Sequence, residues 1–399
     1  MPDIEALNGV ADGDTQAVNG VAKADIQAIN GVDMPSGTTV ASRWVVGMTS
    51  NRVGYAANSD RTSWTFYDSV ASSGEPDALD IDYGKDNSGN AIYVLARDST
   101  NKELHVSGTD VTTDAEWTVI DLGDDTGSTP DSNNDCVVVR WRARSTGAAG
   151  GVWMAAGQQN NERIYRSIDG AANWTAIDLS GLTGHTTDKI KGLDGDGNGN
   201  WMFGQGPRIY YSTDDGASFA VSTPFSGDTG NDAVTEITGV KYTNNSWVIA
   251  YEIGGGSPQD DTFIRSCAAS DITDWGSGVD TGAAAHISGN PASRTSIASY
   301  NGRICVVPHK ATTVGYADIN GKTISNAGSV SMSQGTTDTS RDVATDGTTW
   351  VIATNKGDTW ESTDNAESWS LVTDNMGTGT GGSSGDSSIT ITPNVFGPL

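Results

Sequence analysis

A short apolar element that begins with an aromatic residue recurs along the chain, and it constrains the fold more than any other feature. Its copies are spaced 46 to 60 residues apart. Most follow a turn signal such as "TNNS" or "TDGTT", as expected for the second strand of an antiparallel hairpin. The seven copies are "RWVVG" at Trp44, "IYVLA" at Tyr93, "VWMAA" at Trp153, "NWMFG" at Trp201, "SWVIA" at Trp247, the degenerate "RICVV" at Ile304 and "TWVIA" at Trp350.

A third strand and a corner that closes on an aromatic residue follow each copy, which gives about four strands in about 50 residues. Units of this size bury both of their faces only by stacking between neighbours. The pattern therefore predicts an all-β fold, a seven-bladed β-propeller of four-stranded antiparallel blades over residues 35–373. The corner aromatics are Trp64, Trp117, Trp174, Phe219, Trp275, an unclear position near Ile324 in the sixth unit, and Trp369.

The first unit lacks one strand. Only "SGTTVAS" precedes Trp44, whereas the other units have a plausible strand at this place, such as "EITGVKY" before Trp247. Residues 374–399 form a Gly/Ser-rich linker that is followed by the alternating run "SITITP" (Ser388 to Pro393). We therefore predict that this run is the innermost strand of the first blade and closes the ring.

Residues 1–34 carry a different repeat, with "IEALNGV", "TQAVNGV" and "IQAINGV" at intervals of 11 residues. Apolar positions three apart predict one helical turn in each unit, with Asp3 and Asp25 as N-caps and Asn-Gly as a left-handed exit. One turn is not stable alone. We therefore expect residues 1–34 to be a separate segment for attachment or oligomerisation.

Three of the corners share the pattern Ser-x-Asp followed by an aromatic residue. They are "SIDGAANW" (Ser167 to Trp174), "STDDGASF" (Ser212 to Phe219) and "STDNAESW" (Ser362 to Trp369). They resemble the Asp-box, or bacterial neuraminidase repeat, except that Ala171 and Ala366 replace its glycine. The resemblance, to sialidase-like, sortilin-like and photosystem-assembly-factor-like propellers, implies a peripheral and structural role for the motif. It indicates the fold much more than the function.

The candidates for chemistry are few. Sialidases have an arginine cluster and an early Phe/Tyr-Arg-Ile-Pro segment, and that segment is absent. Arg140, Arg142 and Arg144 alternate along one strand and either hold an anionic sugar or pair with neighbouring carboxylates. A glycosidase would need two carboxylates, for which Asp80 with Asp82 and Asp260 with Asp261 are candidates. We expect no catalytic or cofactor-binding residues.

The loop from Asp194 to Asn200 begins like a calcium loop, with oxygen ligands at Asp194, Asp196 and Asn198. The later ligand positions hold Gln205 or Met202, so a polar hairpin turn explains the loop equally well. The four histidines share no metal-ligand spacing with one another or with the cysteines. We expect no metal site, and no disulfide between Cys136, Cys267 and Cys305.

The overall charge excludes some classes of partner. Fifty acidic and 23 basic side chains give a formal charge of −27, which disfavours binding to nucleic acid and to anionic lipid. No apolar run is long enough to span a membrane, and the N-terminus has no basic region or apolar stretch of a signal peptide. We expect a protein made in a cytoplasm and not inserted into a membrane.

The short Asn-Gly-Val repeats resemble segments in structural proteins of tailed phages. This resemblance implies a non-enzymatic virion protein, of the tail, fibre or capsid decoration, in which residues 1–34 bind other virion proteins. We expect a homo-oligomer whose propeller contacts the host surface, such as a glycan, or the particle lattice. The alternatives are a carbohydrate-binding or glycoside-hydrolysing propeller and an intracellular assembly-factor scaffold.

Overall fold

The computed structural model divides the chain into two compact units, Met1–Ala41 and Ser42–Leu399. In the first unit it describes only short strands between residues 6 and 33. In the second unit it describes residues 43–48, 52–68, 78–97, 103–108, 117–122, 136–148, 150–157, 163–182, 185–186, 188–225, 233–254, 261–284, 294–308, 311–332, 340–354, 357–373 and 388–391.

The described residues of the first unit form three pairs of two-residue antiparallel strands, so the predicted helical turns are wrong. In each pair the two residues between the innermost partners are Asn-Gly, the sequence that most favours a two-residue hairpin loop. This turn preference overrides the apolar spacing. The pairs are β1 (Ala6–Leu7) with β2 (Val10–Ala11), β3 (Ala17–Val18) with β4 (Val21–Ala22), and β5 (Ala28–Ile29) with β6 (Val32–Asp33).

The second unit consists of four-stranded antiparallel sheets in sequence order. The first four blades are β34 (Ser388–Ile391), β7 (Arg43–Gly47), β8 (Arg52–Ala57) and β9 (Asp60–Asp68); β10 (Ala78–Lys85), β11 (Ala91–Arg97), β12 (Glu103–Ser107) and β13 (Trp117–Asp121); β14 (Cys136–Arg142), β15 (Val152–Gly157), β16 (Arg163–Ser167) and β17 (Thr175–Asp178); and β18 (Ile190–Gly195), β19 (Trp201–Gln205), β20 (Arg208–Ser212) and β21 (Ala220–Ser222).

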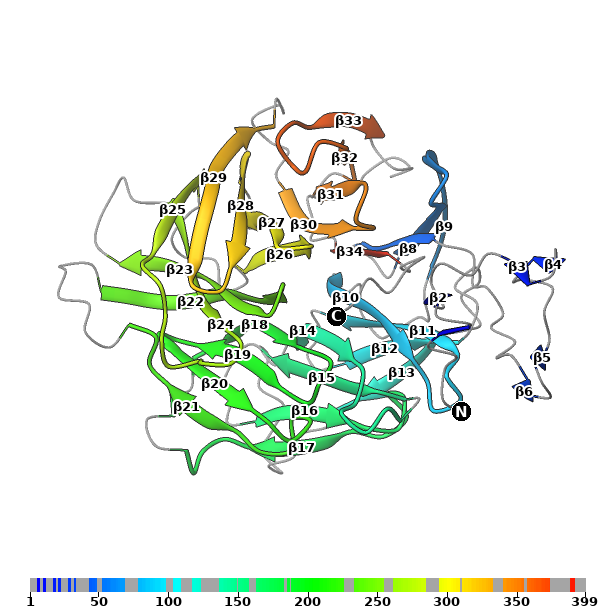
Figure 1. Cartoon of the computed structure of the whole chain (residues 1–399), viewed down its shortest axis with the longest axis horizontal. Helices are drawn as coiled ribbons and strands as arrows, with labels where there is room; N and C mark the ends of the chain where they lie inside the picture. The colour runs from blue at the N-terminus through cyan, green and yellow to red at the C-terminus, as the bar shows by residue number, and fades with distance from the viewer. Residues whose placement is uncertain are drawn as a thin grey trace. The chain divides into compact units, whose positions relative to one another are not determined.

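The remaining blades are β22 (Ala233–Thr243), β23 (Ser246–Gly254), β24 (Asp261–Ala268) and β25 (Val279–Ala284); β26 (Thr295–Tyr300), β27 (Arg303–Pro308), β28 (Thr313–Asn320) and β29 (Thr323–Ser331); and β30 (Ser340–Thr345), β31 (Trp350–Thr354), β32 (Thr359–Ser362) and β33 (Ser370–Thr373). Each blade's innermost strand contacts those of both neighbours, and the blades surround a common centre (Figure 1). The predicted seven-bladed β-propeller is confirmed.

The C-terminal strand closes the ring as predicted. Strand β34 pairs with β7, with Ser388 opposite Gly47 and Ile391 opposite Trp44. It also contacts β30 of the seventh blade and β10 of the second. The first blade is therefore built from both ends of the propeller sequence, and the ring closes through residues 388–391.

The hydrophobic core lies between the blades. The described residues form seven hydrophobic clusters, and each cluster joins two neighbouring blades. The recurring residue of the apolar element occupies the second strand of its blade every time. These side chains are at most 3% exposed, and they are Trp44, Tyr93, Trp153, Trp201, Trp247, Ile304 and Trp350.

The sixth blade is regular, although its corner was unclear in the sequence. Asn320 pairs with Thr323, so a two-residue Gly321-Lys322 loop joins β28 to β29. Gly321 has a φ of +61°, a conformation that glycine adopts without strain. A tight hairpin therefore replaces the Asp-box corner in this blade.

We predict that shortening the closing strand's apolar anchor destabilises the propeller. Ile389 is 3% exposed and packs in the cluster between the seventh and first blades. Ile389→Ala should lower the free energy of unfolding by about 2–5 kcal/mol, because apolar burial is lost and a cavity is left. Leu371→Ala is the control, since Leu371 is 44% exposed on β33. Equal midpoints of thermal unfolding for the two variants would contradict a closing role for β34.

Candidate functional site

The Asp-box corners use their serine and aspartate side chains to hold their own backbone. In the fourth blade, Ser212 Oγ donates to Asp214 Oδ1 (2.6 Å) and accepts the N–H of Gly216 (3.0 Å). Asp214 Oδ1 also accepts the N–H of Ser218 (3.0 Å). The same bonds are made in the third and seventh blades by Ser167, Asp169, Ala171 and Asn173 and by Ser362, Asp364, Ala366 and Ser368.

The two alanines that replace glycine in this motif adopt its left-handed conformation. Ala171 and Ala366 both have a φ of +66°, against +75° for Gly216. Such a conformation costs a residue with a Cβ roughly 1–2 kcal/mol. Both methyl groups are buried in clusters between blades, which offsets part of that cost.

A shorter corner recurs in the first and fifth blades, where the sequences are "DRTSW" and "DITDW". In the first, Asp60 Oδ1 accepts the N–H of Thr62 (3.0 Å) and Trp64 Nε1 donates to the carbonyl of Arg61 (2.9 Å). The fifth blade repeats both bonds with Asp271, Thr273, Ile272 and Trp275. The first and fifth blades therefore share a corner that is shorter than the Asp-box.

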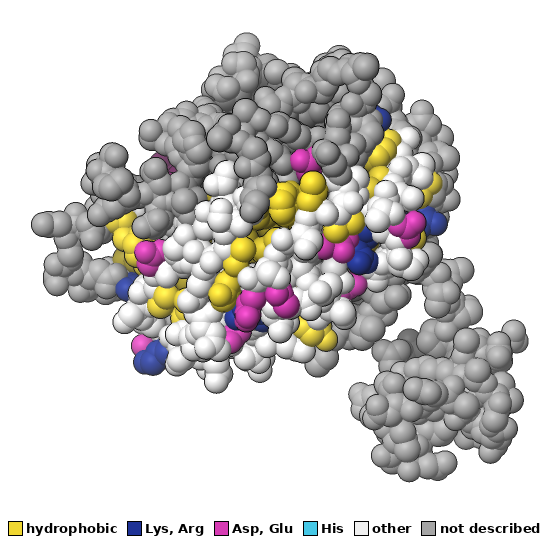
Figure 2. Space-filling view, turned by 90° about the horizontal axis from the view of Figure 1, so that it is seen from above, with side chains coloured by type: hydrophobic (Ala, Val, Ile, Leu, Met, Phe, Trp, Pro, Cys, Tyr) yellow, Lys and Arg dark blue, Asp and Glu magenta, His cyan; other side chains and the backbone are white. Residues whose placement is uncertain are grey.

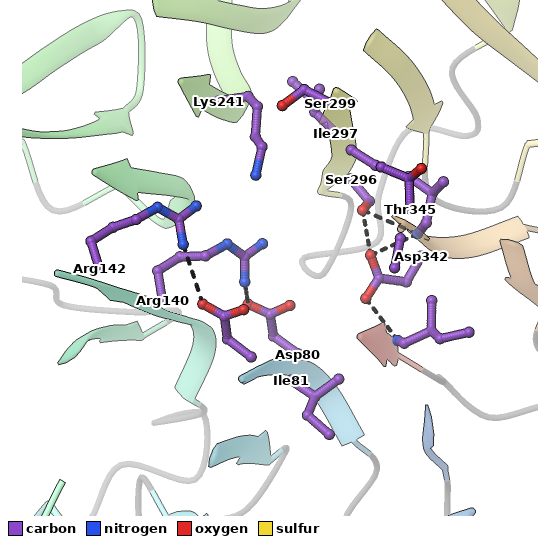
Figure 3. A pocket seen from close by; sticks show the side chains of 15 residues that line it. Asp80, Ile81, Arg140, Arg142, Lys241, Ser296, Ile297, Ser299, Asp342 and Thr345 are labelled. Carbon is purple, nitrogen blue, oxygen red and sulfur yellow. Dashed lines mark hydrogen bonds and ion pairs between the residues drawn. The ribbon is translucent and has the colours of Figure 1, made fainter. Parts of the chain in front are cut away.

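Charged and hydroxyl side chains surround a pocket of about 140 Å³ at the centre of the ring (Figure 3). They come from the innermost strands of five blades. In Figure 3 the two arginines lie on one side of this space, Ser296 and Thr345 lie on the other, and Lys241 and Ser299 lie next to each other between them. The polar lining residues are Asp80 and Asp82 of β10, Arg140 and Arg142 of β14, Lys241 of β22, Ser296 and Ser299 of β26, and Asp342 and Thr345 of β30.

The aspartates of this centre bind the backbone of the next blade. The innermost strand of a blade has an unpaired edge, and its N–H groups need acceptors. Four carboxylates supply them across three blade boundaries. The N–H of Val139 donates to Asp80 (2.9 Å), that of Trp141 to Asp82 (2.7 Å), that of Tyr242 to Asp194 (2.9 Å) and that of Ile389 to Asp342 (3.0 Å).

All three guanidinium groups predicted from "RWRAR" lie beside carboxylates. Arg140 pairs with Asp80, Arg142 pairs with Asp194, and Arg144 lies 4.0 Å from Asp215. Of the two interpretations, the structure therefore favours pairing with neighbouring carboxylates. Arg142 also donates from Nε to the carbonyl of Gly195 (2.9 Å), which joins the third blade to the fourth.

The pKa shifts in this centre reflect burial and the opposing charges. Burial acts to raise the pKa of Asp194, but Arg142, Lys241 and the Tyr242 amide outweigh it, so the pKa lies below its ordinary value. Burial lowers the pKa of Lys241; Asp194 acts to raise it, whereas Arg142 and Arg140 lower it further. Burial raises the pKa of Asp82 against the effect of the two arginines.

These contacts leave Asp80 and Asp82 poorly suited to glycoside hydrolysis. Each carboxylate accepts a backbone N–H and faces an arginine, with Arg142 Nη1 3.6 Å from Asp82. A pocket of about 140 Å³ is also smaller than the roughly 300–1,000 Å³ typical of small-molecule sites. Asp260, of the other candidate pair, lies outside the described residues, and the side chain of Asp261 is also outside them.

The candidate calcium loop is held by its own hydrogen bonds. Asp196 Oδ1 accepts the N–H groups of Asn198 (2.7 Å) and Asn200 (3.0 Å), which is the polar hairpin turn. The side chain of Asp194 pairs instead with Arg142 and Lys241. Its Oδ2 lies 3.5 Å from Lys241 Nζ. Within the described part of the chain, no cluster of His, Cys, Asp and Glu could hold a metal ion.

The remaining candidates form no site among the described residues. Burial and the nearby Arg97 lower the pKa of His105 to about 3, so its buried imidazole is neutral at neutral pH. His286 and His309 lie outside the described residues. The three cysteines are buried, and no disulfide joins them. No helix in the described segments is long and apolar enough to cross a membrane.

Four further residues of this centre carry no local motif in the sequence: Lys241, Arg294, Ser296 and Asp342. Arg294 lies 2.8 Å from Asp80 and 3.4 Å from Asp342, so it reaches carboxylates of the second and seventh blades. The position of these four residues within the repeat is the one feature they share, because all except Arg294 lie in the first strand of a blade. Aligning the first strands would have indicated a shared polar layer.

No protein-family model and no curated protein matches the chain. The solved structures that resemble it include YCF48 from Cyanidioschyzon merolae, with 16% identity, a TM-score of 0.49, and coverage of 76% of this chain and 87% of that one. A structure of YCF48 bound to D1 peptide has 14% identity, a TM-score of 0.48, and coverage of 75% and 83%. A chain of the mitotic checkpoint complex has 12% identity, a TM-score of 0.48, and coverage of 78% and 83%. The likeness is one of fold.

We predict that the Asp-box serine stabilises its corner. Ser212 is 3% exposed, and Ser212→Ala leaves the buried N–H of Gly216 without its acceptor. The free energy of unfolding should fall by about 1–3 kcal/mol. Ser218→Ala, an exposed change in the same turn, is the control and should have a clearly smaller effect. Chemical denaturation measures both, and a larger loss for Ser218→Ala would rule out this explanation.

Removing Asp194 should be among the most damaging changes in the centre. Asp194→Ala removes the carboxylate partner of Arg142 and Lys241 and the acceptor of the Tyr242 N–H. Breaking a buried pair in this way costs about 3–5 kcal/mol. Asp274→Ala is the matched control, because Asp274 pairs with Lys322 in solvent. Calorimetry should show a much lower unfolding temperature for Asp194→Ala alone; similar temperatures would contradict the account.

Proposed function

We propose that this chain is a non-enzymatic structural protein of a phage virion. Residues 1–34 bind other virion proteins, and the propeller is displayed for contact with the host surface or the particle lattice. The observation that carries the proposal is the first unit, with three Asn-Gly hairpins in a unit separate from the propeller. A lone two-stranded hairpin is at best marginally stable in water, so these pairs need something to pack against.

The propeller centre supports a structural rather than a catalytic protein. Its aspartates bind the next blade's backbone and face arginines, as described above. The Asp-box side chains are engaged in their own turns. Rigid closed rings of this kind suit a particle component that must hold its shape.

Surface charge supports protein or glycan partners over nucleic acid. On the described part of the face in Figure 2, Lys and Arg side chains occur as isolated groups, mostly beside Asp and Glu. A formal charge of −27 repels phosphate backbones. We infer that the chain acts as a homo-oligomer in the virion, without nucleic acid or membrane insertion.

Deleting residues 1–34 tests this proposal. The truncated chain should keep the unfolding temperature of the propeller and should no longer self-associate in light scattering. It should also fail to bind virus particles that were assembled in the absence of this protein. The Asn-Gly hairpins are tested by the triple variant Gly9→Ala, Gly20→Ala and Gly31→Ala, since the favoured turn needs a positive φ at that position. Gly13→Ala, outside the Asn-Gly pairs, is the control. Undiminished particle binding by the truncated chain would contradict the proposal.

The alternative of a carbohydrate-binding or hydrolysing propeller has a separate test. Cleavage of glycans by the truncated chain, or glycan binding by a full chain that does not associate with particles, would favour it. The intracellular scaffold would instead be favoured by a stable complex with a host protein and no association with particles.

A further inference from the structure

Lys241 stands out among the charged groups at the ring centre because its ammonium group has an ion-pair partner but donates no hydrogen bond to it. Its Nζ lies 3.5 Å from Asp194 Oδ2 and donates no hydrogen bond within the described residues. Asp194 meanwhile accepts from Arg142, from the Tyr242 amide and from its neighbour Gly195. The carboxylate nearest to Lys241 is therefore already fully engaged.

Arg140 adds unused donors to the same pocket. Its Nη1 donates to Asp80 and to the carbonyl of Val139, whereas Nε and Nη2 donate to no described residue. Arg142 differs, because Nε, Nη1 and Nη2 all donate within the protein. Figure 3 shows the head groups of Arg140 and Lys241 directed into the same space.

The pocket has the size and lining for a small polar guest. A cavity of about 150 Å³ accommodates a molecule such as benzene, and this one measures about 140 Å³. Hydroxyl groups also line the pocket, including Ser299, which lies beside Lys241 (Figure 3) and whose bond to the carbonyl of Tyr242 is long at 3.5 Å. Ammonium and guanidinium donors left over in a polar pocket match an acceptor-only ligand with several oxygens.

We propose that this central pocket binds one small oxyanion, of the size of sulfate, phosphate or acetate, between Lys241 and the free side of Arg140. Asp82 also faces the pocket, 3.6 Å from Arg142, so the anion occupies the side nearer to Lys241. Four carboxylates and four cations already meet at this centre. Selectivity therefore comes from directed N–H groups rather than from net charge. The site would bridge strands β14 and β22, which belong to different blades, and would add to the bonds that hold the ring.

Calorimetric titration of the full chain with sodium sulfate tests the site directly. Sulfate should give saturable heat with one ion per chain, whereas sodium chloride at equal ionic strength should not. The comparison must be of saturable binding, because sulfate also stabilises proteins generally by exclusion from their surface. Acetate in place of sulfate shows whether a planar oxyanion suffices, and saturable binding of either ion supports the proposal.

Lys241→Gln should weaken sulfate binding about tenfold or more, the loss expected for a charge-assisted hydrogen bond. Lys322→Gln, at an exposed surface lysine, should leave the affinity unchanged. Lys241→Arg keeps the charge and should bind within a few-fold of the original, which covers the case in which the glutamine variant fails to fold. Heats of both sulfate and acetate no different from those of chloride, or an unchanged affinity in Lys241→Gln, would overturn the proposal.

Discussion

The unpaired inner edges of the blades are the constraint on which the rest of this structure depends. The innermost strand of each blade has one edge that faces the ring centre. The N–H and C=O groups on this edge have no neighbouring strand to pair with. Buried backbone groups must find partners. Here side chains of neighbouring blades supply several of them, as when Asp80 accepts the N–H of Val139 and Asp342 that of Ile389. The aspartates, in turn, are balanced by the arginines.

The same centre explains why so much charge can be buried in a ring. Each carboxylate has both a backbone donor and a cation, which compensates much of the loss of solvent. Close approach of the inner strands also requires small residues. A Cβ on Gly192 of β18 would lie 2.4 Å from the backbone nitrogen of Val240 in β22. Polar bonds near the axis and seven apolar clusters farther out thus join neighbouring blades to each other.

The sequence predicts the fold well because the fold is repeated. The aromatic element and the turn before it fall at the same place in each blade, so that a weak signal is read seven times. The missing first strand and the alternating "SITITP" run similarly predict the closure by β34. The N-terminal helical turns failed for the opposite reason. Two apolar residues three positions apart indicate a helical turn only weakly. The preference of Asn-Gly for a two-residue hairpin loop is stronger.

The candidate site was harder to predict, since its residues come from separate blades. Alternation along β14 correctly placed Arg140 and Arg142 on one side, but their partners lie at long sequence separation, such as Asp80 and Asp194. Lys241 carries no local motif at all. In a chain with 50 acidic residues, composition cannot show which carboxylates meet at the axis. Only the closed ring brings them together.

Aspartates that bind the backbone of the next blade hold the ring together at its axis. Amide hydrogen exchange of Val139, Trp141, Tyr242 and Ile389 tests this role most directly, because a free strand edge exchanges rapidly and a buried bonded one does not. If the aspartates hold the ring in this way, these four amides should exchange as slowly as the amide of the buried Trp153 on β15. Rapid exchange at these positions in an otherwise protected propeller would contradict it.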